Sequence, residues 1–373
     1  MIEKKKLRIA AFGFRSIPPK PGCAGADKFA SELYPRFVKR GHTVIAYNRL
    51  YPSDNKIYYE FEGVKIINFK TTRFKGFDTL LHSLKATFHI IFKNTADHVH
   101  IHNGGNSIWT MFFRLAGKKT YISQDGFDWK RDKWPWYGKI YLYLSTIITA
   151  NSPNAVIFDN IFVKEEFEKK FKKKFHIIPY GSEIPEIKNK PSVLEKIKLI
   201  SGEYFLFVGR FIPDKGLHYL LKAFQQMQTN KKLVLVGGAP NPSEYEKQLS
   251  ALADERVLFP GFMYGDDVNV LMRNAYAYIQ PSDIEGLSPV ILTVMGIGTP
   301  LICSDIKENI YAVENTALTF KQSNIDSLKK TIEYSLLHPL EIQTLADKAK
   351  QRARTHFSWE KVTDQHLELF FNT

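Results

Sequence analysis

Three apolar segments between Tyr204 and Pro300 constrain the fold more than any other part of the sequence, because each ends in a glycine-containing turn. Each segment has the length and apolar character of a buried strand, and helical patterns follow the first and the third. The strands and their turns are 204–208 with 209–216, 233–236 with 237–238, and 277–280 with 281–286. In a parallel sheet such turns lie together at the carboxyl edge, where ligands bind. The pattern predicts an α/β domain with a ligand site at that edge.

Two cations in the first turn indicate the kind of ligand. Arg210 and Lys215 both stand within 209–216, and the third turn leads into a helix that is expected to start at Gly286–Ser288. Free backbone N–H groups at a helix start attract anions, and fixed positive charges strengthen that attraction. One strand–glycine–helix turn would be weak evidence, since any α/β protein has such turns. Three in order, with two cations, predict a diphosphate site.

The N-terminal half repeats the alternation of strands and helices. The apolar run 7–13 leads into a loop rich in glycine and proline, 16–25, and then into the helix pattern 26–40. Two further strands end at His102 and Ser123, and each precedes a polar turn. Strands that alternate with helices predict a second parallel sheet, with its own ligand edge.

A charged stretch that contains proline, 182–191, is typical of an interdomain linker. Residues 1–184 and 190–356 are therefore predicted as two Rossmann-like, doubly wound domains. The chain of 373 residues is long enough for two sizeable cores. Phe357 to Thr373 forms a last helix pattern, whose place depends on the resemblance described below.

The net charge is +14, and the whole excess lies in the N-terminal half. Residues 1–186 hold 31 Lys and Arg against 17 Asp and Glu, whereas residues 187–373 hold 21 of each class. A basic half is typical of a protein that meets a membrane, a nucleic acid or a phosphorylated acceptor; the alternative is a solubilising surface.

Two helix patterns are candidates for a membrane contact. In 162–175 the phenylalanines are spaced for burial, so the lysines are expected to face solvent, where they would favour an anionic bilayer. The second pattern, 74–92, is basic and aromatic and suits either a membrane surface or the core of the domain.

Cysteine usage and apolar runs point to a cytosolic location. Cys23 and Cys303 are the only cysteines, so neither a disulfide framework nor a zinc pattern is available. The N-terminus lacks the apolar core of a signal peptide, and no apolar run approaches the length of a membrane span.

The turn residues resemble glycosyltransferase family 4, retaining enzymes of the two-domain GT-B fold. The resemblance extends over nearly the whole chain. Its motifs in this sequence are Gly209-Arg210 with Lys215-Gly216, Gly237-Gly238, Pro281-Ser282, and Glu285-Gly286-Leu287 with Met295-Gly296 and Gly298. Within the family, the chain is most similar to a rhamnosyltransferase-like subgroup. That similarity rests on 123–131 with Lys133-Trp134, and on 100–104.

The resemblance, together with the turn chemistry, implies three groups of site residues. The expected catalytic residues are Asp125, Glu285, Arg210 and Lys215. The expected donor-binding residues are Gly22, Gly25, Gly209, Arg210, Lys215, Gly237, Gly261, Phe262, Glu285, Gly286, Leu287, Ser288 and Thr293. The expected acceptor-binding residues are Asp27, His102, Asp128 and Trp129. The resemblance also places the helix 357–373 on the N-terminal domain, across a central cleft from the donor domain.

Some of these residues have structural alternatives. Asp27 belongs either to the site or to plain loop geometry, and a lone histidine at a strand end, such as His102, is more often structural. Asp128 either contacts the acceptor or pairs with Lys130 or Arg131.

The implied reaction moves a sugar from a nucleotide diphosphate to an acceptor hydroxyl, with retention of configuration. Arg210 and Lys215 would neutralise the departing diphosphate, and Asp125 would stabilise positive charge on the sugar or bind its hydroxyls. No Asp-x-Asp pair occurs, so no metal is expected. No second carboxylate is an obvious covalent nucleophile, which favours departure and attack on the same face.

Thr293 departs from the family pattern, in which a glutamate follows Glu285 at this spacing and grips the ribose diol. A threonine offers one hydroxyl and no charge. The donor is then either a dTDP-sugar, whose deoxyribose lacks one hydroxyl, or a UDP-sugar held in another way; a third alternative is a chain that has lost activity and serves as a partner subunit.

We therefore expect a hexosyltransferase that moves a hexose or deoxyhexose, with rhamnose as a candidate, to a saccharide or a lipid-linked saccharide in cell-surface polysaccharide synthesis. Its expected partners are a nucleotide sugar, that acceptor and an anionic membrane at the inner face of the cell membrane, with no nucleic acid and no cofactor. Two alternatives stay open: a polyanion-binding module without catalysis, and a phosphorylase of similar fold, whose pyridoxal-phosphate lysine cannot be assigned.

Overall fold

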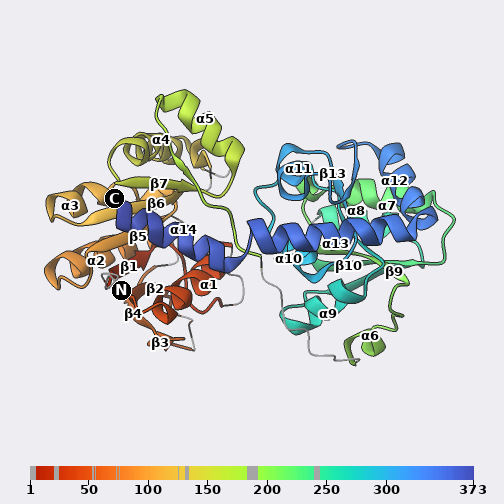
Figure 1. The fold of residues 1–373 in the computed structure, drawn as a ribbon, viewed down its shortest axis with the longest axis horizontal. Helices are drawn as coiled ribbons and strands as arrows, with labels where there is room; N and C mark the ends of the chain where they lie inside the picture. Colours follow the sequence, from red (N-terminus) through yellow and green to blue (C-terminus); the bar gives the residue numbers. More distant parts are fainter. Residues whose placement is uncertain are drawn as a thin grey trace. The chain divides into compact units, whose positions relative to one another are not determined.

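The computed structural model describes residues 6–20, 25–52, 54, 56–72, 74, 76–124, 126–130, 134–182, 192–238 and 244–373. The chain divides into two compact domains (Figure 1). The N-terminal domain comprises Met1–Tyr180 and Trp359–Thr373, and the C-terminal domain comprises Gly181–Ser358. Most of the predicted linker lies outside the described residues.

An eight-stranded sheet forms the centre of the N-terminal domain, in the order β3-β4-β2-β1-β5-β6-β7-β8. The strands are β1 (Arg8–Phe12), β2 (Thr43–Leu50), β3 (Glu60–Phe61), β4 (Val64–Lys70), β5 (His98–His102), β6 (Lys119–Gln124), β7 (Ala155–Phe158) and β8 (His176–Ile177). Neighbouring strands pair in parallel, except that β3 runs antiparallel to β4. In β1, Ile9 and Ala11 enter one core cluster while Ala10 and Phe12 enter another. Because both faces of the sheet are covered at β1, its residues 9–12 form a continuous apolar run.

Helices cover both faces of this sheet. The helices α1 (Gly25–Lys39) and α14 (Trp359–Asn372) share a core cluster on one face, and α2 (Phe77–Phe92) and α3 (Trp109–Leu115) contribute to the cluster on the other. The remaining elements are η1 (Gly104–Asn106), η2 (Asp128–Lys130), α4 (Trp136–Asn151) and α5 (Ile161–Phe171). The predicted helix 162–175 ends earlier than expected, because Lys172 adopts a left-handed conformation with φ 52°.

The C-terminal helix completes the N-terminal domain, as Figure 1 shows for α14. Trp359, Val362 and Phe370 are buried in the same cluster as α1. The hydroxyl of Tyr121 in β6 donates to the carbonyl of Phe370 at 3.3 Å and hydrogen-bonds Oγ1 of Thr373 at 2.8 Å.

The C-terminal domain is built on a six-stranded parallel sheet in the order β11-β10-β9-β12-β13-β14. Its strands are β9 (Tyr204–Arg210), β10 (Lys232–Gly238), β11 (Val257–Gly261), β12 (Ala277–Gln280), β13 (Leu301–Ser304) and β14 (Leu318–Phe320). Its helices are α6 (Ser192–Lys196), η3 (Pro213–Lys215), α7 (Leu217–Gln225), α8 (Glu244–Leu252), α9 (Asp266–Asn274), α10 (Pro289–Ile297), α11 (Lys307–Val313), α12 (Ile325–Leu337) and α13 (Pro339–His356).

Each sheet has a point at which the strand order reverses. In the N-terminal domain the reversal lies between β1 and β5, and in the C-terminal domain between β9 and β12. Loops that leave such neighbouring strands diverge, which opens a crevice at their carboxyl ends. The two sheets confirm the predicted pair of Rossmann-like domains, and the reversal points say where to look for ligand sites.

Candidate active site

The reversal point of the C-terminal sheet brings together the first and third predicted turns. The turn after β9 carries Lys215, and the turn after β12 carries Glu285. The backbone N–H groups of Asp283 and Ile284 donate to the carbonyl of Asp214 at 2.9 and 3.5 Å, which ties the two turns to each other. Gly216 has φ +67°, and a Cβ there would lie 2.0 Å from the carbonyl oxygen of Pro281, so only glycine fits this close approach.

The Glu285 carboxylate is the centre of this region. The Lys215 ammonium forms an ion pair with its Oε1 atom. The Gln280 amide donates to the same oxygen at 2.5 Å, and the Ser282 hydroxyl donates to it at 2.8 Å. The side chain of Glu285 is only 8% exposed and that of Lys215 is 16% exposed. Three donors on one oxygen fix the carboxylate, and among the described residues no donor reaches Oε2, which is left to accept from a ligand.

Further hydrogen bonds from buried side chains orient those donors. The Tyr278 hydroxyl donates to Oε1 of Gln280 at 2.8 Å, which leaves the Gln280 amide nitrogen pointing at the carboxylate. Ser304 donates to the carbonyl of Ser282, and Asn309 donates to Oγ of Ser304 at 3.0 Å. All of these supporting side chains are buried. Sequence reasoning missed them; the one available signal was a polar residue, Gln280, at the end of an otherwise apolar strand.

Arg210 lies at the end of β9 and is exposed, and no described residue forms an ion pair with it. Beside it, Gly237 has φ +137°, and a Cβ there would lie 1.8 Å from the carbonyl of Gly209. At Gly238 a Cβ would come within 2.9 Å of the Phe262 ring. These glycines leave the backbone uncovered next to a free guanidinium, which suits the close approach of an anion.

The helix after the third turn begins later than predicted. Helix α10 starts at Pro289 with Ser288 as its N-cap, so Gly286 and Leu287 precede the helix and do not belong to its first turn. Proline at the first position has no N–H, which reduces the number of free donors there. A side chain at Gly286 would meet nothing within 4 Å, whereas Leu287 is buried. Thr293 is buried in α10 and donates to the carbonyl of Pro289 at 2.9 Å, so its hydroxyl can still accept.

The remaining predicted donor residues of this domain follow β10 and β11. Gly261 has φ +79° and ends β11. Phe262 is 51% exposed, and its ring stacks with that of Tyr264 at an interplanar angle of 2°. An exposed aromatic face beside the glycine turn after β10 can stack on a planar base.

The reversal point of the N-terminal sheet carries a group of buried histidines. His102 ends β5, is 3% exposed, and its Nε2 lies 2.6 Å from the Tyr34 hydroxyl, which also lies 2.9 Å from Nδ1 of His100. Burial lowers the pKa of His102 to about 3 and the pKa of His366 to about 4. His366 comes from α14, and its ring centroid lies 5.6 Å from that of His100.

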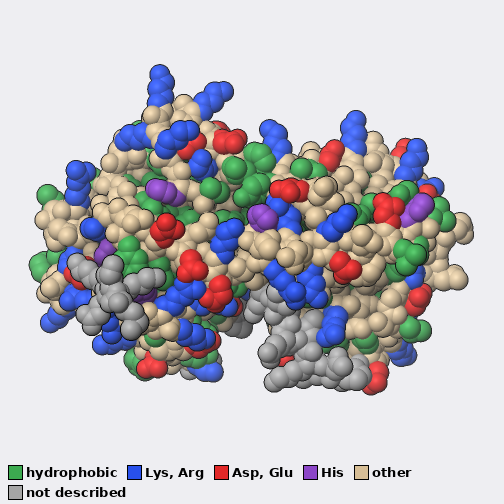
Figure 2. Space-filling model, viewed as in Figure 1, with side chains coloured by type: hydrophobic (Ala, Val, Ile, Leu, Met, Phe, Trp, Pro, Cys, Tyr) green, Lys and Arg blue, Asp and Glu red, His purple; other side chains and the backbone are tan. Residues whose placement is uncertain are grey.

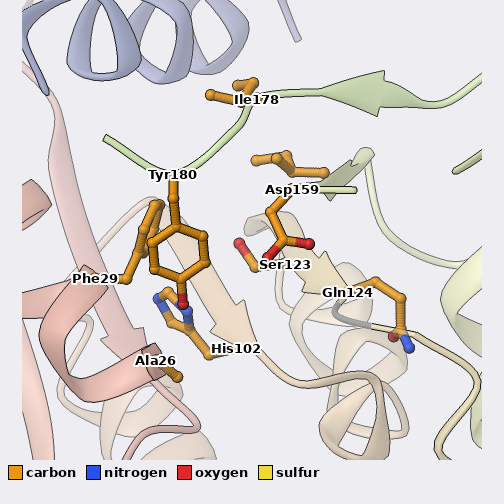
Figure 3. A pocket seen from close by; sticks show the side chains of 9 residues that line it. Ala26, Phe29, His102, Ser123, Gln124, Asp159, Ile178 and Tyr180 are labelled. Atoms are coloured by element: carbon orange, nitrogen blue, oxygen red, sulfur yellow. The ribbon is translucent and has the colours of Figure 1, made fainter. Parts of the chain in front are cut away.

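A small hollow opens beside His102, at the carboxyl ends of β5, β6 and β7 (Figure 3). Its volume of about 20 Å³ is enough for one water molecule. Figure 3 shows the Asp159 and Ser123 side chains pointing toward each other, with Tyr180 standing over one side. The hollow offers hydroxyl, amide, imidazole and carboxylate groups at the edge where the sequence predicts the acceptor site.

The structure describes only some of the predicted residues of the N-terminal domain. Gly22, in the loop after β1, lies outside the described residues, and so does Asp125, which follows β6. Gly25 opens α1, where a Cβ would lie 3.1 Å from the Tyr180 hydroxyl. Asp27 is only 2% exposed, and its Oδ1 accepts from the backbone N–H groups of Arg15 and Ser16 at 2.6 and 3.0 Å. The Asp27 carboxylate thus anchors the loop after β1, which is one of the two roles that the sequence left open, and its contact with an acceptor stays a prediction.

Asp128 and Trp129 lie in η2, next to the lysine-bearing helix α5. The Trp129 ring meets Tyr143 of α4 in a T-shaped contact with centroids 5.5 Å apart. The Lys170 ammonium lies 4.9 Å from the centre of the Trp129 ring and 4.7 Å from that of Tyr143. These contacts tie Trp129 to α4 and α5, and Lys170, which is exposed as expected, lies over the two rings. Asp128 is half-buried and begins η2.

Among the described residues, no group of three or more His, Cys, Asp or Glu side chains is arranged to hold a metal ion. The expected catalytic groups of the C-terminal domain are two cations, Arg210 and Lys215, and one fixed carboxylate, Glu285. They can bind an anion and a hydroxyl side by side.

Residues 191–356 match the family described as glycosyl transferases group 1. Relatives by sequence include an uncharacterized glycosyltransferase, YqgM, of Bacillus subtilis, which is 33% identical over 39% of this chain and 40% of its own length. The D-rhamnosyltransferase WbpZ of Pseudomonas aeruginosa is 28% identical over 58% of this chain and 57% of its own length. The chain spans about half the length of the curated relatives it matches.

Solved structures extend the likeness to the whole chain. A sucrose-phosphate synthase of Thermosynechococcus elongatus matches with a TM-score of 0.82 and 20% identity over 98% of both chains. Anabaena HepE, solved in complex with UDP-glucose, matches with a TM-score of 0.78 and 17% identity over 98% of this chain and 100% of its own. At this identity the likeness concerns the fold, and it confirms the predicted GT-B class.

Proposed function

We propose that this chain, whose residues 191–356 match glycosyl transferases group 1, is a glycosyltransferase that uses a nucleotide diphosphate sugar as its donor. Curated relatives that act in O-antigen chain synthesis support a role in polysaccharide synthesis. The product would be an extended saccharide, free or lipid-linked.

The observation that carries the proposal is the fixed Glu285 carboxylate. An ion pair that is largely buried is costly unless its groups are well hydrogen-bonded, and here Gln280 and Ser282 supply those bonds. The Lys215 ammonium has three donors and uses one on Glu285, which leaves two for a phosphate oxygen. Glu285 keeps Oε2 for a sugar hydroxyl. A cation for the diphosphate and an acceptor for the sugar therefore stand side by side.

The proposed chemistry divides among these residues. The bond between the anomeric carbon and the diphosphate breaks while the acceptor oxygen attacks from the same face, and the acceptor proton passes to the departing phosphate oxygen. Arg210 and Lys215 stabilise the charge that grows on the diphosphate, with charge-assisted hydrogen bonds worth roughly 1.5–3 kcal/mol each. No metal takes part in this proposal, so chelation with EDTA should leave the rate unchanged.

Two donors compete within the proposal. Thr293 offers one hydroxyl to the ribose, which suits a dTDP-sugar such as dTDP-rhamnose. A D-rhamnosyltransferase among the relatives supports a deoxyhexose, whereas the UDP-glucose bound to Anabaena HepE supports a UDP-sugar. We favour the deoxythymidine donor on the residue at position 293.

The acceptor side of the proposal uses the N-terminal domain. His102 and Asp128 follow strands at its ligand edge. Of the two, His102 lines the small hollow described above. We propose a saccharide or a lipid-linked saccharide as the acceptor, presented at the inner face of the cell membrane. No helix among the described residues is long and apolar enough to cross a membrane.

Calorimetric titration of UDP, dTDP and phosphate tests the donor site. Wild type should bind a nucleoside diphosphate, and Arg210→Ala should reduce the affinity by about tenfold or more. Lys307→Ala, a change to a cation of α11 in the same domain, is the control and should bind like wild type. A polyanion-binding module would instead bind phosphate, UDP and dTDP alike, with no transfer product, and that result would end the proposal.

A further inference from the structure

Helices α2, α3 and α4 expose large apolar side chains on the outside of the N-terminal domain. The most exposed are Phe92 at 76%, Leu115 at 88% and Trp136 at 75%. Figure 2 shows hydrophobic side chains next to Lys and Arg along the edge that α2 and α3 form. An exposed apolar surface carried by three neighbouring helices marks an interaction site, unlike single surface hydrophobics, which are ordinary.

The burial pattern of α4 is inverted relative to a soluble amphipathic helix. Its buried positions include Ser145, Thr146 and Thr149, which are small and polar. Its exposed positions include Ile140 at 53% and Leu144 at 53%, spaced one helical turn apart. A surface helix in water turns its apolar stripe to the core. This helix does the reverse, so its outer face is shaped for an apolar environment.

Hydrogen bonds join the three helices into one layer. Ser83 of α2 donates to Asn106 of η1 at 2.8 Å, and Ser107 donates to the carbonyl of Ser145 in α4 at 2.7 Å. Thr110 of α3 donates to Oγ of Ser152, just after α4, at 2.7 Å. The layer is thus held from within by small polar residues.

The charges on this layer are of one sign. The three helices contain a single carboxylate, Asp78, and it is turned inward to an ion pair with Arg49 at 3.1 Å. Arg114 in α3 and Lys93 at the end of α2 are exposed. Cations around an apolar face complement anionic lipid head groups and repel a second copy of the same face.

We propose that the outer face of α2, α3 and α4 binds an anionic bilayer and inserts its apolar side chains at the level of the head groups. This proposal concerns the surface alone and stands independently of the donor chemistry. It includes α2, one of the two candidates from the sequence, and leaves out α5, whose three lysines are balanced by Glu165, Glu166 and Glu168.

Co-sedimentation with vesicles tests the proposal. Wild type should bind vesicles of phosphatidylcholine mixed with phosphatidylglycerol and bind phosphatidylcholine alone about tenfold less. The variant Phe92→Ser with Leu115→Ser and Trp136→Ser should lose about tenfold or more of the binding to the mixed vesicles. A matched control replaces three apolar residues of the C-terminal domain that are 73–84% exposed, Ile200, Leu337 and Leu340, with serine and should bind like wild type.

Tryptophan quenching gives a second measurement that does not depend on removing apolar surface. Brominated phosphatidylcholine in the mixed vesicles should quench part of the fluorescence, and Trp136→Phe should abolish that part while keeping vesicle binding. Equal vesicle binding by wild type and the triple serine variant would overturn the proposal. So would a dimer in lipid-free sedimentation that the triple variant abolishes, because that result would assign the face to a second copy.

Discussion

The two sheets both reverse their strand order beside the first strand of the domain, but the side chains at the two reversal points differ. Between β9 and β12 the C-terminal domain holds an ion pair, Lys215 with Glu285, and an exposed Arg210. Between β1 and β5 the N-terminal domain buries neutral imidazoles under Tyr34. Topology therefore selects the place of a site, and the side chains at the strand ends decide whether it receives an anion.

Low pH should destabilise the N-terminal domain more than the C-terminal domain, and this is the largest effect that we expect. Burial lowers the pKa values of His82, His100, His102 and His366, all in the N-terminal domain. The unfolded chain takes up protons near pH 6.5 that the folded domain does not, so its stability falls as the pH drops below about 6.5. Each histidine then costs about 1.4 kcal/mol per pH unit, down to its folded pKa.

Calorimetric melts from pH 7 to pH 5 measure this effect. The N-terminal domain should unfold first at pH 5, because each of the four histidines costs about 2 kcal/mol there. The three histidines of the C-terminal domain are exposed or half-buried. A C-terminal domain that unfolds first at pH 5 would contradict the assignment.

Removing the cation of the charged reversal point should give the next largest effect. Lys215→Met should reduce kcat/KM at least about a hundredfold, equivalent to about 2.7 kcal/mol, because the ammonium pairs with Glu285 and, in the proposed reaction, contacts the departing diphosphate. Lys222→Met removes an exposed cation from α7 and serves as the matched control. Initial rates of sugar transfer measure both. Equal rates in the two variants would refute the role of Lys215.

Removing the hydroxyl of the neutral reversal point should affect stability and not donor binding. Tyr34→Phe leaves His100 and His102 without their shared partner, which should lower the free energy of unfolding by about 1–3 kcal/mol. Tyr59→Phe changes a tyrosine that is 72% exposed and should stay within about 0.5 kcal/mol of wild type. Urea unfolding measures stability, and nucleotide titration serves as the second readout. A loss of nucleotide affinity in Tyr34→Phe would contradict the assignment of donor binding to the C-terminal domain alone.

The smallest effect concerns the choice of nucleotide. Thr293→Glu should shift the preference toward UDP over dTDP by about tenfold, or about 1.4 kcal/mol, because a carboxylate can hold both ribose hydroxyls. Thr293→Gln has nearly the same shape without the charge and should shift the preference less. Competition between the two nucleotides measures the ratio. A wild type that already prefers UDP by tenfold would rule out the deoxyribose explanation.

Local features were predictable from the sequence, and long-range partners were not. The glycine turns follow from backbone conformation, since Gly216 and Gly237 have positive φ angles that other residues rarely adopt. The strand 277–280 was predicted with its observed ends because three apolar residues and Gln280, all buried, precede a proline. By contrast, the partner of Glu285 lies 70 residues away. Only the folded sheet brings Lys215 to it.

The sequence also did not predict which polar residues are buried and what they bind. Asp27 stands in a loop that resembles a site, but its carboxylate caps two backbone groups of the preceding turn. His100 alternates with apolar residues in β5, a pattern that gives no sign that Tyr34 will satisfy its ring. In α4 the small polar residues Ser145 and Thr149 are buried, and Thr149 donates to the carbonyl of Gly104 in η1 at 3.5 Å, an orientation that hydrophobic periodicity alone does not indicate.

Helix α14 has a consequence for how this chain is made. The first domain to leave the ribosome cannot close its core, because Trp359, Val362 and Phe370 are synthesised only after the whole second domain. At about 5–20 residues per second, the gap lasts roughly 10–40 s. During that time the apolar face of α1 has no native cover, so a chaperone that holds nascent chains would find its target there. Truncation before Trp359 would make that interval permanent.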